Sequence, residues 1–219
     1  MKAAAFRVFH RFQKSRALMA VGLVSLPLAL GACIPAIFGA GTATGVAVAQ
    51  ERSVGGAIDD GAIQVALQGK LFDRSGGLFV KVGIEVDEGR VLLTGVVPKP
   101  NDRIDAARIA WSVKGVKEVL NEIQVTDKSG LISYTKDVWI TTKLRSKIIR
   151  DDKIFGINYT IETVNTVVYL IGIAQGADEL NRVTEHARNI GGVTEVISHV
   201  RYKDDPRRTW SRRAKACCS

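Results

Sequence analysis

Apolar residues recur along this chain with two different spacings. The first run returns every four positions and predicts a helix with one buried face: Ile63, Leu67 and Leu71. Over Val80–Val86 apolar and polar residues alternate, which is typical of a strand that is buried on one face. Residues 87–90 form a predicted turn into a second alternating run, 91–97, so a β-hairpin is expected.

The next segment adds a second helix and a third strand. Asn101 is expected to cap a helix with a small and apolar inward face: Ala106, Ala110 and Val113. Gly115 follows where this helix would end, and residues 116–125 supply another strand. The predicted order of elements is therefore α-β-β-α-β.

The same pattern occurs twice in the chain. When the sequence is shifted by 77 positions, residues 63–125 lie on residues 140–202 without a gap. Identical pairs are spread over the whole register: Ile63 and Ile140, Leu67 and Leu144, Ile84 and Ile161, Gly95 and Gly172, Gly115 and Gly192. We therefore predict two α+β domains, at 54–127 and 128–203, each with a three-stranded sheet and two helices packed on it.

Gly95 and Gly172 interrupt strands at positions where a side chain would normally pack. Glycine inside a strand usually marks a close approach of the backbone or of a helix. We expect a structural role for both glycines rather than a ligand cradle, and the sequence holds no glycine-rich phosphate loop.

The N-terminal segment is typical of an exported bacterial protein. A basic stretch without acidic residues precedes an apolar stretch that ends in small residues, which predicts a signal peptide over 1–32. Cys33 follows Leu-Gly-Ala, which is similar to the lipidation motif of bacterial lipoproteins, so Cys33 is the expected site of acylation. An uncleaved membrane anchor stays open as an alternative, because no charged residue lies between Arg16 and Glu51. Residues 33–53 are expected to form a tether.

Charge is unevenly distributed along the chain. The sequence has 31 basic and 22 acidic residues, a formal net charge of +9. Five basic residues lie in 1–32, and seven basic against two acidic residues lie in 201–219. The part between them is close to neutral, so no nucleic-acid partner is expected. We expect the basic tail, 204–219, to be disordered, and the adjacent Cys217 and Cys218 to pair between chains or to remain substrates for thiol oxidases.

The repeated pattern resembles the BON domain, a bacterial module of osmotically induced periplasmic proteins, secretins and channels. The likeness rests on the order of elements, on Gly95 and Gly172 within strands, and on the Gly-Val pair before each last strand. Two further stretches, Arg52–Gly55 and Trp139–Ser146, are similar to dual-BON outer-membrane lipoproteins of enterobacteria. That resemblance implies a location on the periplasmic face of the outer membrane, a role in envelope integrity, and binding of anionic phospholipid by the second domain. Ile34, where a retained inner-membrane lipoprotein has Asp, agrees with this location.

The first helix of the second copy carries residues that fit this implication. On a helical projection Trp139 lies beside the predicted core stripe, and four cations share its side: Lys136, Lys143, Lys147 and Arg150. An indole flanked by cations suits a bilayer interface with anionic headgroups, so these five are the candidate phospholipid-binding residues. The matching positions of the first copy hold one cation and no aromatic residue: Asp59, Ala62, Ala66, Lys70 and Asp73.

Two other interpretations stay open. Trp139 could fill a gap between the domains while the lysines form a solvated helix face. The protein could also be an adaptor that uses this helix, or the edge of a sheet, to hold an envelope assembly or secretion protein. The sequence does not show whether the two domains touch.

No catalytic arrangement is recognisable in the sequence. His186 lies next to the core stripe of a predicted helix and His199 in a predicted strand, so both are expected to be structural. The serines have no base or nucleophile elbow around them. We expect a protein that is not an enzyme, with no cofactor, no metal site and no small-molecule substrate.

Overall fold

The computed structural model describes residues 54–126 and 131–208. The predicted signal peptide, Cys33 and the predicted tether lie outside these ranges, as do Cys217 and Cys218. Both repeats fall largely inside them, so the architecture of each domain is visible.

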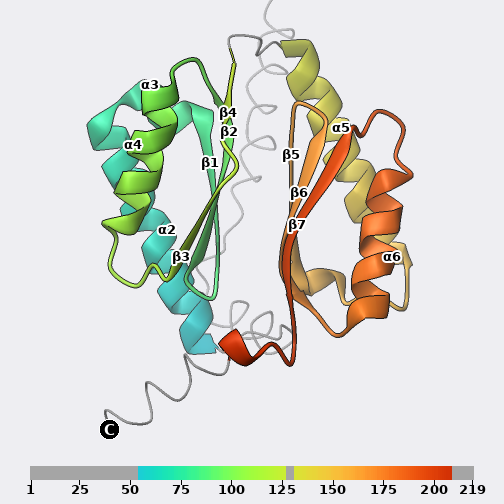
Figure 1. The fold of residues 1–219 in the computed structure, drawn as a ribbon. Helices are drawn as coiled ribbons and strands as arrows, with labels where there is room; N and C mark the ends of the chain where they lie inside the picture. The colour runs from blue at the N-terminus through green and yellow to red at the C-terminus, as the bar shows by residue number, and fades with distance from the viewer. Residues whose placement is uncertain (1–53, 127–130, 209–219) are drawn as a thin grey trace, which may run out of the picture. The chain divides into compact units, whose positions relative to one another are not determined.

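The first domain is a mixed sheet covered on one face by helices (Figure 1). Its elements, in chain order, are α2 (Val54–Arg74), α3 (Gly76–Lys81), β1 (Val82–Asp87), β2 (Arg90–Val97), α4 (Pro100–Trp111), β3 (Glu118–Asn121) and β4 (Gln124–Val125). β1 runs antiparallel to β2, whereas β3 and β4 both pair with β2 in parallel. The predicted third strand is therefore present, but it is divided in two.

The second domain repeats this arrangement. Its elements are α5 (Leu131–Arg150), the short 3₁₀ helix η1 (Gly156–Asn158), β5 (Tyr159–Val164), β6 (Val167–Ala174), α6 (Ala177–Arg188) and β7 (Glu195–Tyr202). The strand order is β5-β6-β7, with β5 antiparallel and β7 parallel to β6. The structure confirms the predicted α+β fold and, apart from the short added helices, the order α-β-β-α-β in each copy.

Each domain has an apolar core between its helices and its sheet. The predicted stripes of the first helices lie in these cores: Ile63, Leu67 and Leu71 in one, Ile140, Leu144 and Ile148 in the other. Small and apolar residues of the second helices are fully buried as well: Ala106, Ala110, Val183 and Ala187. Burying one such leucine or isoleucine contributes about 1.5–3 kcal/mol, so these stripes hold the helices on the sheets.

Two local predictions are wrong. The N-terminus of α3 is capped by the Ser75 hydroxyl, and the helix includes Val80. β1 therefore begins two residues later than predicted. Val80 is 81% exposed there. The cap of α4 is Lys99 rather than Asn101, because Pro100 occupies the first turn, where its missing N–H leaves no hydrogen bond unmade.

Gly95 in β2 and Gly172 in β6 occupy equivalent places and have positive φ angles of 120° and 143°. A Cβ atom on Gly95 would collide with the backbone carbonyl of Lys81, and one on Gly172 with that of Asn158. In each domain the residue that leads into the first strand therefore lies directly against this glycine. The predicted close approach of the backbone is confirmed.

Each sheet has a second apolar face, away from its helices. Leu92 of β2 and Tyr169 and Ile171 of β6 form one buried cluster. Partly buried residues of both domains surround it: Leu120, Val164, Val167 and Ile197. Leu92 and Ile171 are each only 1% exposed. The two domains therefore pack sheet against sheet, a contact that the sequence left open.

A buried aspartate supports the hairpin turn of each domain. Asp60 of α2 accepts hydrogen bonds from the backbone N–H groups of Glu88 and Gly89, at 2.8 and 2.7 Å. Asp137 of α5, 77 positions later, accepts hydrogen bonds from both turn residues 165–166, each at 2.8 Å. All these turn residues have positive φ angles. The carboxylates thus hold two turns in a conformation that most residues disfavour.

The start of the C-terminal tail differs from the predicted disorder. Residues 204–208 are placed, and a helical turn brings Arg208 to the first domain. The Arg208 Nε atom lies 3.0 Å from a Glu88 carboxylate oxygen, and the side chain is 2% exposed. Its NH1 group donates a hydrogen bond to the Lys203 carbonyl at 2.6 Å. These contacts hold the turn, so the prediction was wrong for 204–208; residues 209–219 lie outside the described ranges.

Candidate membrane-binding face

α5 carries the candidate phospholipid-binding residues along one side. Trp139 is 48% exposed, while Ile140, next in the chain, is fully buried in the core. The boundary between solvent and core therefore runs along the helix where the helical projection placed it. Within the described part of the chain, Trp139 does not belong to the cluster between the two sheets, so it does not fill a gap there.

Lys143 lies one turn further along α5 than Trp139. Its Nζ atom is 5.7 Å from the centroid of the Trp139 ring. At this distance the ammonium group is attracted to the negative face of the indole. The pair presents a positive charge and an amphipathic ring together at the surface.

The other three cations are spread along the same helix. Lys136 is exposed, and its side chain lies against Gly192 in the loop before β7. Lys147 is half-buried, and Arg150, the last residue of α5, is exposed. From Lys136 to Arg150 the helix rises by about 20 Å, so the candidates form a strip rather than a pocket. Among the residues that the structure describes, no carboxylate forms a salt bridge with any of these four cations.

Three apolar side chains on this helix were not among the predicted site residues. Tyr134, Val138 and Ile149 are 67%, 48% and 80% exposed. Helical spacing separates Val138 from Ile149 by only about 20° around the axis, so they share one outward face. Their positions off the core stripe were a usable signal in the sequence. The exposed side of α5 thus holds an apolar row as well as the cationic strip, and the two are separated by about 120–140° around the axis from Lys143.

The equivalent positions of α2 are also at the surface, but their side chains differ chemically from those of α5. All five are exposed: Asp59, Ala62, Ala66, Lys70 and Asp73. α2 presents apolar side chains elsewhere, at Ile58, Val65 and Phe72, which are 68%, 68% and 61% exposed. The first domain therefore has an outward apolar row without the cationic strip of the second.

Asp151 fixes the C-terminal end of α5 to α6. Its carboxylate accepts hydrogen bonds from Arg182 at 2.9 and 2.7 Å and lies 2.8 Å from His186 Nε2. The hydrogen bonds from His186 and Arg182 lower the pKa of Asp151 to about 2. This contact gives His186 a structural partner and holds the end of the helix that carries the candidate site.

We expect the contribution of Asp151 to stability to depend on pH. Its pKa is lower in the folded chain than the ordinary value of 3.8, so its contribution is present above that value and is lost as the pH falls to about 2. Asp151→Asn should therefore be less stable than the parent near neutral pH, and the two proteins should converge at about pH 2 in acid-unfolding curves. A stability difference that stayed constant down to about pH 2 would contradict this assignment.

His199 of β7 contacts the first domain. Its Nε2 atom lies 2.9 Å from Glu122 Oε1, and its backbone carbonyl accepts a hydrogen bond from Arg90 at 2.6 Å. Within residues 54–126 and 131–208, no three His, Cys, Asp or Glu side chains are grouped so that they could hold a metal ion. None of the helices in the described part of the chain is long and apolar enough to cross a bilayer.

Comparison with known proteins identifies the repeated unit. The family described as BON domain matches the chain twice, over residues 59–127 and 136–204. A protein of Anaplasma centrale, described as an uncharacterized protein in the gshII 5′ region, is 43% identical over 147 residues, which is 67% of this chain and 96% of that protein.

Two further relatives carry descriptive names. Outer membrane lipoprotein DolP of Haemophilus influenzae is 29% identical over 183 residues, covering 83% of this chain and 94% of the relative. Osmotically-inducible protein Y of Escherichia coli is 27% identical over 154 residues, covering 69% of this chain and 77% of the relative. With two matches to the family that together span more than half of its length, the chain belongs to the BON domain family.

Proposed function

We propose that this protein is a lipid-anchored envelope-integrity protein on the periplasmic face of the outer membrane, and that its second BON domain binds anionic phospholipid. Cys33 is the site of acylation in this proposal. The lipid-binding residues are Lys136, Trp139, Lys143, Lys147 and Arg150. The protein acts by binding and not by catalysis.

The observation that carries the proposal is the exposed pair of Trp139 and Lys143. An indole that is 48% exposed leaves part of a large apolar ring in water, and the ammonium group 5.7 Å from its centroid is available to an anion. A bilayer interface offers partners to both, because tryptophan rings reside at headgroup depth and lysines contact lipid phosphates. The exposed Val138 and Ile149 add apolar area on the same helix.

The relatives support the proposed location. The name of the Haemophilus influenzae relative describes an outer membrane lipoprotein, and its similarity extends over most of this chain. That description agrees with acylation at Cys33. The Escherichia coli relative is named for osmotic induction, which agrees with a role in the envelope.

The expected affinity of the cationic strip alone is modest. Each lysine or arginine near an anionic leaflet contributes about 1 kcal/mol, and this contribution is weakened by salt. An acyl chain on Cys33 would keep the domain close to the bilayer and raise its effective concentration there. Weak recognition of headgroups by α5 is then sufficient for function.

We expect a chain of residues 54–219 to bind phosphatidylglycerol or cardiolipin vesicles without an anchor. It keeps all three apolar clusters, which lie between Ile63 and Val200. Sedimentation should show binding that decreases with salt. Lys143→Glu should weaken it about tenfold, because the change replaces an attraction by a repulsion, and Trp139→Ala should weaken it through loss of the interfacial ring.

The repeat provides a matched control for this experiment. Lys70→Glu makes the same charge change on α2 of the first domain and should alter vesicle binding by less than about twofold. Parent-like binding by both Lys143→Glu and Trp139→Ala would show that α5 is not the membrane-binding element.

A second candidate function is supported by α2. Ile58, Val65 and Phe72 recur every seven residues and are more than half exposed. Phe72 also contacts Phe79 edge to face, with 5.7 Å between the ring centroids. An exposed apolar row of this kind is typical of a surface that binds another protein. A pulldown of an envelope protein that is lost in Phe72→Asp, with vesicle binding unchanged in that variant, would favour this adaptor function.

A further inference from the structure

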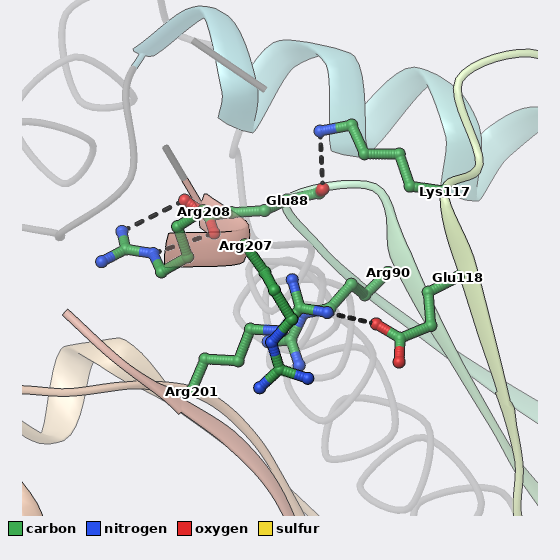
Figure 2. Close-up of a pocket in the computed structure, with 7 residues that line it drawn as sticks. All are labelled: Glu88, Arg90, Lys117, Glu118, Arg201, Arg207 and Arg208. Carbon is green, nitrogen blue, oxygen red and sulfur yellow. Dashed lines mark hydrogen bonds and ion pairs between the residues drawn. The ribbon is translucent and has the colours of Figure 1, made fainter. Parts of the chain in front are cut away.

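A charged cleft lies where the two domains meet. Its volume is about 250 Å³. Five cationic and two acidic residues line it, as Figure 2 shows: Glu88, Arg90, Lys117, Glu118, Arg201, Arg207 and Arg208. The first four belong to the first domain, and the last three belong to β7 and the turn that follows it. Both domains therefore contribute cations to one hollow.

Arg90, the first residue of β2, supplies a buried guanidinium group to this cleft. Its side chain is 3% exposed, and its NH2 atom is 2.6 Å from an Asp87 carboxylate oxygen. Its NH1 group donates to the backbone carbonyl of His199 at 2.6 Å. The Nε atom has no hydrogen-bond partner among the described residues. Buried donors are nearly always paired, so the unpartnered Nε shows that this guanidinium group has fewer acceptors than donors.

Arg201 places a second guanidinium group beside the first. Its NH2 atom is 2.5 Å from Glu118 Oε2 across the domain boundary. Burial lowers the pKa of Arg201, and the positive charges of Arg90 and Arg207 lower it further. The cations in this cleft therefore repel one another, and a negative charge between them would relieve that repulsion.

The carboxylates near the cleft do not balance its cations. Four ion pairs join arginines to carboxylates: Arg90–Asp87, Arg201–Glu118, Arg207–Asp205 and Arg208–Glu88. Lys117 has no carboxylate partner among the described residues, and its Nζ atom donates to the Glu88 backbone carbonyl at 2.9 Å. The five cations of the cleft are therefore matched by four carboxylates, which leaves a net charge of +1.

We propose that this cleft binds a phosphate-class oxyanion. Guanidinium groups suit such anions because their planar N–H donors form paired, charge-assisted hydrogen bonds with oxygen atoms. The groups that gain most from the anion are Arg201, which lies beside two other guanidinium groups, and Lys117, which has no carboxylate partner among the described residues. Because Arg90 and Lys117 belong to one domain and Arg201 to the other, the bound anion joins the two domains.

The test is titration calorimetry of the full chain in detergent with inorganic phosphate. We expect saturable binding that weakens as salt is added. Arg201→Gln should weaken it about tenfold, because a charge-assisted contact is lost. Glu118→Gln should tighten it, because it releases Arg201 from its carboxylate. Both variants break the ion pair between Arg201 and Glu118. If Arg201 had only a structural role, the two substitutions would therefore change the affinity for phosphate in the same direction.

A second arm distinguishes free phosphate from a lipid headgroup. Phosphatidate vesicles are mixed with the Lys143→Glu chain, which lacks part of the α5 strip. A further loss of vesicle binding in Lys143→Glu with Arg201→Gln indicates that the cleft takes a headgroup phosphate. Phosphate binding in calorimetry without this further loss indicates the free anion. The proposal is overturned if calorimetry shows no phosphate binding and Arg201→Gln causes no further loss of vesicle binding, or if Arg201→Gln and Glu118→Gln weaken phosphate binding equally.

The phosphate site in the cleft and the membrane contact of α5 are tested by different variants and different measurements. Lys143→Glu alone should leave the calorimetric affinity for phosphate unchanged. A negative result in the phosphate titration would leave the proposed membrane contact of α5 standing, and loss of vesicle binding by α5 variants would leave the cleft standing.

Discussion

Gly172→Ala is expected to lower the free energy of unfolding by about 3 kcal/mol. Gly172 has a φ angle of 143°, which an alanine rarely adopts, and its Cβ atom would overlap the backbone carbonyl of Asn158. The neighbour is backbone at the entry to β5, so it cannot move aside as a flexible side chain would. Urea unfolding followed by circular dichroism measures the loss.

Gly69→Ala is the control for this substitution. A Cβ atom on Gly69, inside α2, would meet nothing within 4 Å. Alanine should therefore raise the stability by about 0.5–1 kcal/mol, because it favours the helix over the unfolded chain. If Gly172→Ala cost less than about 1 kcal/mol, the close approach of the backbone at this strand would be less strict than the structure indicates.

Asp137→Ala is expected to lower the free energy of unfolding by about 3 kcal/mol as well. Asp137 is 8% exposed and accepts two backbone hydrogen bonds, both at 2.8 Å, from the turn between β5 and β6. Without the carboxylate these N–H groups lose their acceptor, and each such loss costs about 1–3 kcal/mol. The turn residues have positive φ angles, so the turn also loses the contact that holds this conformation.

The measurement for Asp137 is the same unfolding experiment, with Asp152→Ala as the control. Asp152 is exposed, and its loss should change the stability by less than about 0.5 kcal/mol. Asp60→Ala should behave like Asp137→Ala, since Asp60 makes the equivalent pair of hydrogen bonds in the first domain. A small effect at both aspartates would mean that the turns form without them.

The elements of each domain could be predicted because short-range spacing determines them. The period of four at Ile63 and Ile140, and the shift of 77 residues between the copies, were enough for the helices, the hairpins and the fold class. The same spacing placed Trp139 at the edge of the core stripe, where the structure has it. Its role in lipid binding stays a prediction.

The alternation of apolar and polar residues predicts a strand that is buried on one face only. It therefore did not reveal the contacts between the domains. Leu92 interrupts the alternation of β2, and Tyr169 and Ile171 do so in β6, because both faces of these strands are covered. Continuous apolar runs of this kind are typical of strands buried on two sides, so the signal was present. The burial of Arg90 had no such signal, because it depends on His199 and Arg201, which follow it by more than a hundred residues.

The cluster of Leu92, Tyr169 and Ile171 also bears on why the unit is duplicated within one chain. Helices cover only one side of each sheet, so an isolated copy would expose these side chains to water and tend to associate with other molecules. Joining two copies in one polypeptide gives each exposed side a neighbour at a high and constant local concentration. We therefore expect a fragment that holds either repeat alone to self-associate, whereas the pair of repeats covers these side chains within one chain.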